Sequence, residues 1–434
     1  SDLIETINSL SITINKDKLN DMFNNVEDDN FSEIIKICRR ITYKLEPGES
    51  DDRNKLVNWK NKYMNILSEK YSSNLYSINF DVLKEIDNSK PIYSDDNELV
   101  DGRIIIRDNF DKLLEKNNRI FIFGEDVGMI GDVNQGLEGL QKKYGKNRVF
   151  DTGIRESTIV GQGIGMSMRG LRPIAEIQYL DYILYALQIL SDDLATLTFR
   201  THGGQKAPLI VRTRGHRLEG IWHSGSPLGG ILNFLRGIFV LTPRNMTKAA
   251  GFYNSLLDID QPAVVIEPLN GYRTKEKLPI NYGEFKTPLG EIEVLKEGND
   301  ITLVSYGSTV NIVNKVAKEI QNFNIDCEVI DLQSLIPFDL SKNIYKSIIK
   351  TNRLMIIDED VPGGGSSFIL QELLNSQDIY EHLDSKPCLV TAKEHRPPYG
   401  SDGDYISKPS FEDIFEEVYT VMNEANPSKY KKLI

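Results

Sequence analysis

From residue 103 onward, short runs of consecutive apolar residues alternate with longer segments in which apolar residues recur every three or four positions. The short runs are typical of strands buried on both faces, and the longer segments are typical of amphipathic helices. Strands separated by helices of about 10 to 15 residues predict a mostly parallel sheet covered by helices. The predicted strands of this first unit are 119–124, 149–150, 171–180, 207–215, 237–243 and 262–268, and its predicted helices are 103–117, 137–145, 181–200 and 244–257.

A second unit with the same alternation starts near Leu289. The link before it, 275–292, contains the Pro and Gly residues that are typical of a boundary. The predicted strands of the second unit are 301–307, 327–335, 353–360 and 386–395, and its predicted helices include 309–323 and 411–423.

The first hundred residues have a different composition, rich in Asn, Asp, Lys and Ser. Apolar residues recur at helical spacing within this segment, which predicts surface helices without visible chemistry. We therefore expect an α/β protein with three parts. These are a helical N-terminal segment or linker (1–100), an α/β domain (101–283) and a smaller α/β domain (284–434).

The stretch 149–170 reads as a strand end, a sharp turn and a helix that begins near Glu156. The helix is dense in small residues, namely Gly161, Gly163, Gly165, Ser167 and Gly170. Each Gly inside a helix costs about 1 kcal/mol relative to Ala, so a helix that keeps several usually lets another backbone approach closely. Two interpretations follow. The helix packs tightly in an ordinary core, or it forms a close-packed interface with a functional carboxylate, Glu156, at its start.

The chain has 434 residues, a formal net charge of −12 and a pI of about 5.1. This balance argues against a nucleic-acid partner, and it offers no polybasic anchor for a membrane. No apolar run approaches the roughly 20 residues of a membrane span, and the N-terminus lacks the pattern of a secretory signal. Cys38, Cys327 and Cys388 are scattered and lack metal-site spacing, which fits a reducing compartment. We expect a cytoplasmic protein with no metal ligands of its own.

The predicted sheet directs attention to the loops at its carboxyl edge, where open α/β sheets bind ligands. Glu125, Asp151, Asp181 and the Gly-rich segment 215–230 fall at or near this edge. His216 and His223 share that Gly-rich segment, which makes it a candidate site or a merely ordered loop. The sequence contains no zinc motif, phosphate-binding P-loop or nucleophile elbow.

Several longer stretches occur together in one order: FIFGEDVG, KKYGKNRVFDT, IRESTIVGQGIGMSMRGLRPIAEIQYLDY, HSGSP, EVIDLQSLIPFD and KTNRLMIIDED. Through them, residues from about 103 to 430 resemble the β subunit of the thiamine-diphosphate-dependent first component of 2-oxo acid dehydrogenases, within the transketolase-like superfamily. The resemblance implies a transketolase-like pyrimidine-binding domain followed by a smaller transketolase C-terminal domain. The first hundred residues lie outside it, and would correspond to the tail of an α-type region if the chain is part of a fused α/β protein.

The resemblance also implies roles for particular residues. Glu156 matches the catalytic glutamate that hydrogen-bonds N1′ of the aminopyrimidine and favours the imino tautomer, whose 4′-nitrogen takes the thiazolium proton. Tyr182 matches an aromatic residue that stacks on the pyrimidine, Glu125 an acid at the same cofactor edge, and Ile154 an apolar neighbour of the ring. His223 matches a catalytic loop histidine near the substrate.

Three positions depart from the family pattern. Gly153 stands where the family commonly has proline, and Arg155 stands where a small residue is usual. Gly225 replaces the glutamine of the family's His-Ser-Gln. These departures bear on the geometry of the loop and the substrate, and not on Glu156.

The family's Gly-Asp-Gly motif, which binds the diphosphate through magnesium with a later Asn, does not occur in this sequence. In the family that motif belongs to the α subunit. The resemblance therefore implies that this chain binds only the pyrimidine half of thiamine diphosphate, and that a partner chain or domain carries the magnesium ligands. The expected partners are an α-type subunit or domain, a second copy of this half and a lipoyl-bearing acyltransferase. The Gly-rich helix becomes an expected subunit contact.

The function implied is oxidative decarboxylation of a 2-oxo acid on thiamine diphosphate, followed by acyl transfer to a lipoyl group. We expect the chain to be inactive without its α-type partner, and a branched-chain 2-oxo acid is favoured over pyruvate. Two alternatives remain open at this point. One is a transferase related to transketolase or deoxyxylulose-phosphate synthase, and the other is a non-catalytic assembly module of the same fold.

Overall fold

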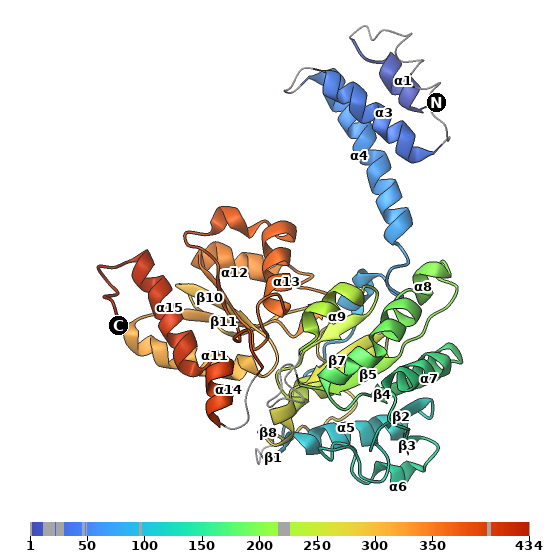
Figure 1. Ribbon diagram of the computed structural model, residues 1–434, viewed down its shortest axis with the longest axis vertical. Coiled ribbons are helices and arrows are strands. Elements are labelled where there is room, and N and C mark those ends of the chain that lie inside the picture. Colours follow the sequence, from blue (N-terminus) through green and yellow to red (C-terminus); the bar gives the residue numbers. More distant parts are fainter. Residues whose placement is uncertain are drawn as a thin grey trace. The chain divides into compact units, whose positions relative to one another are not determined.

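The protein's structure is a computed structural model that describes residues 2–11, 22, 30–45, 48, 50–94, 98–215, 226–396 and 401–433 (Figure 1). The chain forms two compact units, Ser1–Asn74 and Leu75–Ile434. Within these residues, no helix combines the length and the apolar character that crossing a membrane requires.

The N-terminal unit consists of helices around a small apolar core. Its helices are α1 (Asp2–Asn8), α3 (Phe31–Lys44) and α4 (Asp51–Ser72). The side chains of Asn30 and Ser50 cap α3 and α4 by accepting backbone N–H bonds from the first turn. Cys38, Leu56 and Trp59 are buried at the centre of the core. The helices predicted from apolar spacing in this segment are therefore confirmed.

The compact helical unit ends at Asn74, and the residues that follow it belong to the larger unit. The N–H of Ser77 donates to the side chain of Gln261 at 2.8 Å, and the Tyr76 ring packs 5.9 Å from the Phe239 ring. Tyr76 and Ser77 therefore pack against the α/β part of the chain.

The larger unit contains a seven-stranded sheet. Its strands are β2 (Ile120–Gly124), β3 (Val149–Asp151), β4 (Arg172–Glu176), β5 (Ile210–Arg214), β6 (Phe239–Leu241), β7 (Ala263–Glu267) and β12 (Ser334–Ile336). Their order is β12-β6-β7-β5-β4-β2-β3, and every neighbouring pair except β12 and β6 is parallel. Strands β4, β5 and β7 are buried along their whole length, as expected for strands covered on both faces. The predicted parallel sheet is confirmed.

Helices surround this sheet (Figure 1). They include α5 (Gly102–Lys116), α6 (Leu140–Tyr144), α7 (Glu156–Met168), α8 (Leu197–Arg200), α9 (Leu228–Phe234) and α10 (Met246–Leu257). Helices α5 and α10 pack together through a hydrogen bond of 2.9 Å from Asn109 to Asn254 and a ring contact between Phe110 and Tyr253. A short antiparallel pair, β1 (Leu99–Asp101) with β8 (Lys275–Lys277), lies beside them.

The second sheet has five strands in the order β14-β13-β10-β11-β9. Its strands are β9 (Glu293–Lys296), β10 (Ile301–Ser305), β11 (Cys327–Asp331), β13 (Leu354–Ile357) and β14 (Cys388–Val390). Its helices are α11 (Thr309–Glu319), α12 (Asn343–Thr351), α13 (Gly365–Gln371), α14 (Ser401–Ser407) and α15 (Phe411–Ala425). Only β9 runs antiparallel to its neighbour, so the predicted second α/β unit is confirmed.

The single strand predicted at 327–335 is wrong, because the chain changes sheets inside it. Strand β11 ends at Asp331, Gln333 adopts a left-handed backbone with φ 61°, and β12 then pairs with β6 of the seven-stranded sheet. The N–H of Thr242 donates to the carbonyl of Gln333 at 2.8 Å and joins the two sheets at this turn.

The long regular helix predicted at 181–200 is also wrong. The chain forms a 3-10 segment, η2 (Leu180–Ala186), then a π segment, η3 (Ile189–Leu194), and then α8. The buried residues are spaced by three in the first part (Leu180, Ile183, Ala186) and by four in the second (Leu190, Leu194). The 3-10 segment has fewer residues per turn than the π segment, and this difference keeps the buried residues of both segments facing the core.

Shorter segments complete the described elements. They are η1 (Phe80–Glu85), η4 (Leu269–Tyr272), η5 (Ile320–Phe323), η6 (Glu372–Ser376) and η7 (Ile379–His382).

Candidate functional site

The carboxyl ends of the parallel strands carry the predicted acids. Glu125 follows the last residue of β2 directly, and Glu156 is the first residue of α7, shortly after β3 ends at Asp151. Tyr182 lies in η2, in the segment that follows β4. This edge is where open parallel sheets bind their ligands.

Three predicted residues lie within electrostatic reach of one another. Burial raises the pKa of Glu125, and the neighbouring Asp126 and Glu156 carboxylates raise it further. Burial also raises the pKa of Tyr182, with further contributions from Asp181, Glu125 and Glu156. The structure therefore brings Glu125, Glu156 and Tyr182 together at one place.

The Glu156 residue is only 9% exposed, at the N-terminus of a 13-residue helix. The helix dipole favours a carboxylate at this end. Within the described residues, neither Glu156 nor Glu125 has a hydrogen-bond or ion-pair partner. A largely enclosed carboxyl group without a partner in the protein, such as that of Glu156, is suited to a hydrogen bond with a ligand.

The two remaining predicted residues have different positions. Ile154 lies between β3 and α7 and is 76% exposed, so it presents an apolar surface to solvent next to Glu156. His223 lies outside the described residues, as does His216.

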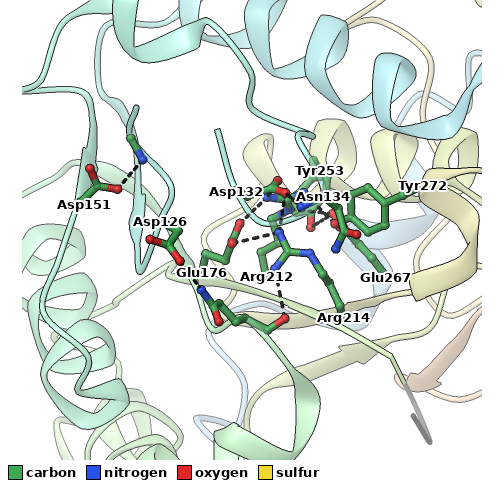
Figure 2. A network of polar contacts seen from close by, with 12 residues as sticks. Asp126, Asp132, Asn134, Asp151, Glu176, Arg212, Arg214, Tyr253, Glu267 and Tyr272 are labelled. Carbon is green, nitrogen blue, oxygen red and sulfur yellow. Dashed lines mark hydrogen bonds and ion pairs between the residues drawn. The ribbon is translucent and has the colours of Figure 1, made fainter. Parts of the chain in front are cut away.

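A network of charged side chains is buried at the same edge of the sheet (Figure 2). Arg212 of β5 bonds to Asp132 at 2.9 Å and to Glu267, at the end of β7, at 2.9 Å. It also bonds to Glu176 at the end of β4. Arg214 bonds to Asp132 at 3.1 Å and to Glu176 at 2.9 Å. All five side chains have zero exposure, so the network is shielded from water.

Two buried tyrosines complete the network (Figure 2). The hydroxyl of Tyr253 donates to Glu267 at 2.6 Å. The hydroxyl of Tyr272 accepts from Arg212 at 2.8 Å and donates to Glu267. Burial raises the pKa of both tyrosines well above the usual range, so both remain neutral donors.

The network combines two guanidinium groups with three carboxyl groups. Burial opposes ionisation of Asp132, but Arg214 and Arg212 together outweigh it and lower its pKa. At Glu176 burial dominates and raises the pKa despite both arginines. Asp132 is thus held as a carboxylate, and Glu176 retains a proton more readily than Asp132 does.

The sequence patterns did not single out this network. Arg212, Glu176 and Glu267 lie inside runs that read as strands buried on both faces. Charged residues are almost never fully buried unless they are paired, so their presence in such runs is a signal that could have pointed to the network. Asp132 carried no comparable signal, because it lies in a loop.

Among the described residues, no group of three or more His, Cys, Asp and Glu side chains is arranged to hold a metal ion.

Comparison with protein families assigns both α/β parts of the chain. Residues 99–275 match the transketolase pyrimidine-binding domain, and residues 290–406 match the transketolase C-terminal domain. A chain of a split-gene transketolase, in an inactive β4 tetramer, has a TM-score of 0.59 and 18% identity to this chain. The match covers 75% of this chain and 98% of that one, and it shows the same fold.

Curated relatives share more of the sequence. The chain is 34% identical to the pyruvate dehydrogenase E1 component subunit beta of Acholeplasma laidlawii, over 66% of this chain and 87% of the relative. It is 32% identical to the 2-oxoisovalerate dehydrogenase subunit beta of Pseudomonas aeruginosa, over 70% and 90%. The corresponding pyruvate dehydrogenase subunit of Bacillus subtilis is 29% identical, over 71% and 94%. These relatives favour the dehydrogenase interpretation over the transketolase-like transferase, and the chain belongs to the family of β subunits of pyruvate and 2-oxoisovalerate dehydrogenases.

Proposed function

We propose that this chain is the β-type half of a thiamine-diphosphate-dependent 2-oxo acid dehydrogenase. The assembled enzyme would decarboxylate pyruvate or a branched-chain 2-oxo acid oxidatively and transfer the acyl group to a lipoyl group. The observation that carries the proposal is the buried carboxyl of Glu156 at the start of α7, within electrostatic reach of Glu125 and Tyr182. Membership of the family supports the same conclusion.

The residues at this edge suit the aminopyrimidine of thiamine diphosphate. An aminopyrimidine offers polar ring atoms at its edge and flat apolar faces. The buried Glu156 carboxyl supplies a group that can share a proton with a ring nitrogen. Tyr182 supplies an aromatic surface, and the exposed Ile154 supplies an apolar contact. These three side chains therefore match the edge and the faces of the ring.

When bound, the cofactor supplies the electron sink for decarboxylation, and the protein supplies position and electrostatics. Glu156 would hold a proton between its carboxyl group and the pyrimidine nitrogen. At Glu125, burial raises the pKa, and the neighbouring Asp126 and Glu156 carboxylates raise it further. His223 is proposed to exchange hydrogen bonds with oxyanions that develop during acyl transfer.

Exposed apolar side chains around the acids support a partner at this edge. Met129 (88% exposed) and Ile130 lie in the loop after β2, Ile154 precedes α7, and Leu184 and Tyr185 lie on η2. Clustered apolar exposure commonly marks an interface. We infer that an α-type subunit or domain covers this surface and carries the diphosphate and magnesium ligands. A second copy of this half and a lipoyl-bearing acyltransferase would complete the assembly.

Calorimetry tests the half-site directly. Thiamine diphosphate is titrated with magnesium into this chain alone, and then into this chain with its α-type partner. We expect tight binding only in the presence of the partner. Tight magnesium-dependent binding by the isolated chain would refute the half-site. Failure of the assembled enzyme to decarboxylate pyruvate, 2-oxoisovalerate and 2-oxoglutarate would refute the proposed reaction.

A further inference from the structure

The loop after β2, residues 125–139, is tied to the sheet by Asp132. The N–H of Asp132 donates to the carbonyl of Asp126 at 2.9 Å, which folds the loop back on itself. The two carboxylate oxygens of Asp132 then bond to Arg212 and Arg214 of β5. A single buried side chain therefore connects this loop to the centre of the sheet.

Arg214 extends the connection to the segment that follows β4. Its Nη1 donates to the backbone carbonyl of Gln178 at 3.0 Å. The side-chain amide of Gln178 in turn donates to the carboxylate of Asp126 at 3.0 Å, and Asp126 lies in the same loop as Asp132. Asp126 is the immediate neighbour of Glu125, and Tyr182 follows Gln178 in the same segment. These hydrogen bonds and ion pairs therefore link the loop that contains Glu125 to the segment that contains Tyr182, and both residues are proposed to bind the cofactor.

The loop is held in a costly backbone conformation. Asp126, Asp132 and Gln135 have φ angles of 57°, 67° and 63°, in the left-handed region that side chains other than glycine rarely adopt. Backbone strain of this kind persists where many surrounding contacts hold the backbone in place, and strained residues tend to cluster at functional sites. A Cβ at Gly136 would lie 2.9 Å from both Arg212 Nη2 and Asp132 Oδ2, so a glycine there lets the loop pack onto the network.

A purely stabilising role accounts poorly for this arrangement. The desolvation of buried charges largely offsets their attraction, and apolar residues of similar volume often stabilise a fold as well. Another buried arginine offers a comparison: Arg172, at the amino end of β4, bonds to Asp260 at 2.9 Å and to two backbone carbonyls. Arg172 therefore joins elements away from the carboxyl edge of the sheet. Asp132 and Arg214 instead contact the loop and the segment that contain the proposed site residues.

We infer that Asp132 and Arg214 are positioning residues, which fix the loop bearing Glu125 and the segment bearing Tyr182 in the geometry that the cofactor requires. The inference rests on the proposed function. It assigns these residues no contact with the cofactor or the substrate.

The test compares Asp132→Asn and Arg214→Gln with the control Arg172→Gln, each assembled with the α-type partner. Three quantities are measured: kcat and KM for the 2-oxo acid, the unfolding midpoint, and hydrogen–deuterium exchange of 125–139. The two network variants should lower kcat about 10- to 100-fold while KM stays within about threefold, because misplaced groups slow the chemical step. Exchange of 125–139 should accelerate in these variants and not in Arg172→Gln.

The double variant adds a second readout. Because Asp132 and Arg214 belong to one network of ion pairs and hydrogen bonds, their effects should not add. The double variant Asp132→Asn with Arg214→Gln should therefore lose little more kcat than either single variant. If Arg214→Gln does not fold, Arg214→Lys takes its place. The lysine keeps the charge but lacks the fork of donors that reaches several partners, so the same loss of kcat is expected.

Distinct outcomes separate this inference from the proposed function. Unchanged kcat in both network variants overturns the inference, as does a loss that only follows the unfolding midpoint in the same way as in Arg172→Gln. If the wild-type assembly decarboxylates no 2-oxo acid, the proposed reaction fails. The exchange data then decide the positioning role alone: faster exchange confined to 125–139 and the segment after β4 supports it, and unchanged exchange overturns it.

Discussion

Glu156 combines two features that seldom coincide in one side chain. Its position at the start of α7 is electrostatically favourable, because the helix N-terminus stabilises a negative charge. The residue is also only 9% exposed, and its side chain has no hydrogen-bond or ion-pair partner among the described residues. A ligand that shares a hydrogen bond with the carboxyl group would supply the missing partner, as proposed above for the pyrimidine.

Replacing Glu156 by Gln in the assembled enzyme should lower turnover by about 10²- to 10⁴-fold, because the amide cannot accept or release a proton at the pyrimidine. Assembly should remain intact, since the side chain keeps its size. Steady-state decarboxylation and sedimentation of the complex measure the two effects. Glu138→Gln, at an exposed glutamate in the loop after β2, is the matched control and should retain activity. Near-normal turnover of Glu156→Gln would remove this residue from the mechanism.

The positions of Glu125 and Glu156 could be predicted from the sequence, because both follow apolar runs that read as parallel strands. Carboxyl ends of parallel strands share one edge, so two such acids are expected to be neighbours. The pairing of Asp132 with Arg212 and Arg214 could not be predicted in this way. It joins residues 80 positions apart through a loop whose fold depends on left-handed residues, which apolar spacing does not reveal.

At the scale of elements, α7 shows that glycines in one helix can have different roles. A Cβ at Gly163 would lie 2.6 Å from a methyl group of the fully buried Leu209, so this glycine permits close packing in the core. A Cβ at Gly161 or Gly165 would meet nothing within 4 Å. The core interpretation thus applies to Gly163, and the interface interpretation remains a hypothesis for the two exposed glycines.

Alanine at these positions should therefore have opposite effects. Gly163→Ala should destabilise the chain by about 1 kcal/mol, since overpacking of about 1–3 kcal/mol exceeds the gain of about 1 kcal/mol in helix propensity. Gly161→Ala should be neutral or stabilising in the isolated chain, but should weaken association with a partner subunit. Chemical denaturation and analytical ultracentrifugation measure stability and association. Equal stability losses in both variants would contradict this division of roles.

The interrupted helix at 181–200 shows what apolar periodicity cannot predict, namely where a helix changes its number of residues per turn. Apolar spacings of three and four are both compatible with an α-helix, so the sequence alone favours a continuous one. Tertiary packing instead selects a 3-10 turn followed by a π turn, and Tyr182 and Tyr185 both lie in the 3-10 segment. The identity of these residues was visible in the sequence, but the backbone conformation of their segment was not.

At the scale of the whole larger unit, an ion cluster connects the two sheets. Arg244, just after β6, bonds at 2.6 Å to Asp331, the last residue of β11, and it also bonds to Glu293 of β9. Burial raises the pKa of Asp331 from 3.8 to about 6, and Arg244 opposes that rise only in part. The connection between the sheets is therefore sensitive to pH between 3.8 and about 6.

The sign of this effect follows from proton binding. Between pH 3.8 and about 6 the folded state binds a proton at Asp331 that the unfolded state has released, so this contribution to stability is lost as the pH rises. The shift corresponds to about 3 kcal/mol. Asp331→Asn should flatten the fall in unfolding free energy over this range, measured by denaturant titrations at several pH values. Parallel pH profiles for the variant and the wild type would contradict this assignment.

The general plan of two α/β parts was visible in the alternation of apolar runs, whereas the exchange of a strand between the sheets was not. One left-handed residue, Gln333, redirects the chain from β11 into β12, and a single backbone angle leaves no mark on the hydrophobic pattern.

That exchange makes the two parts of the larger unit difficult to separate. A protein cut between residues 283 and 284 would lose β12 and leave β6 as an uncovered edge strand whose residues are all apolar. Such an edge is a template for pairing with other chains, so the isolated pyrimidine-binding part would tend towards aggregation. During synthesis the same edge stays open until the second part emerges, and β12 then covers the edge of the seven-stranded sheet.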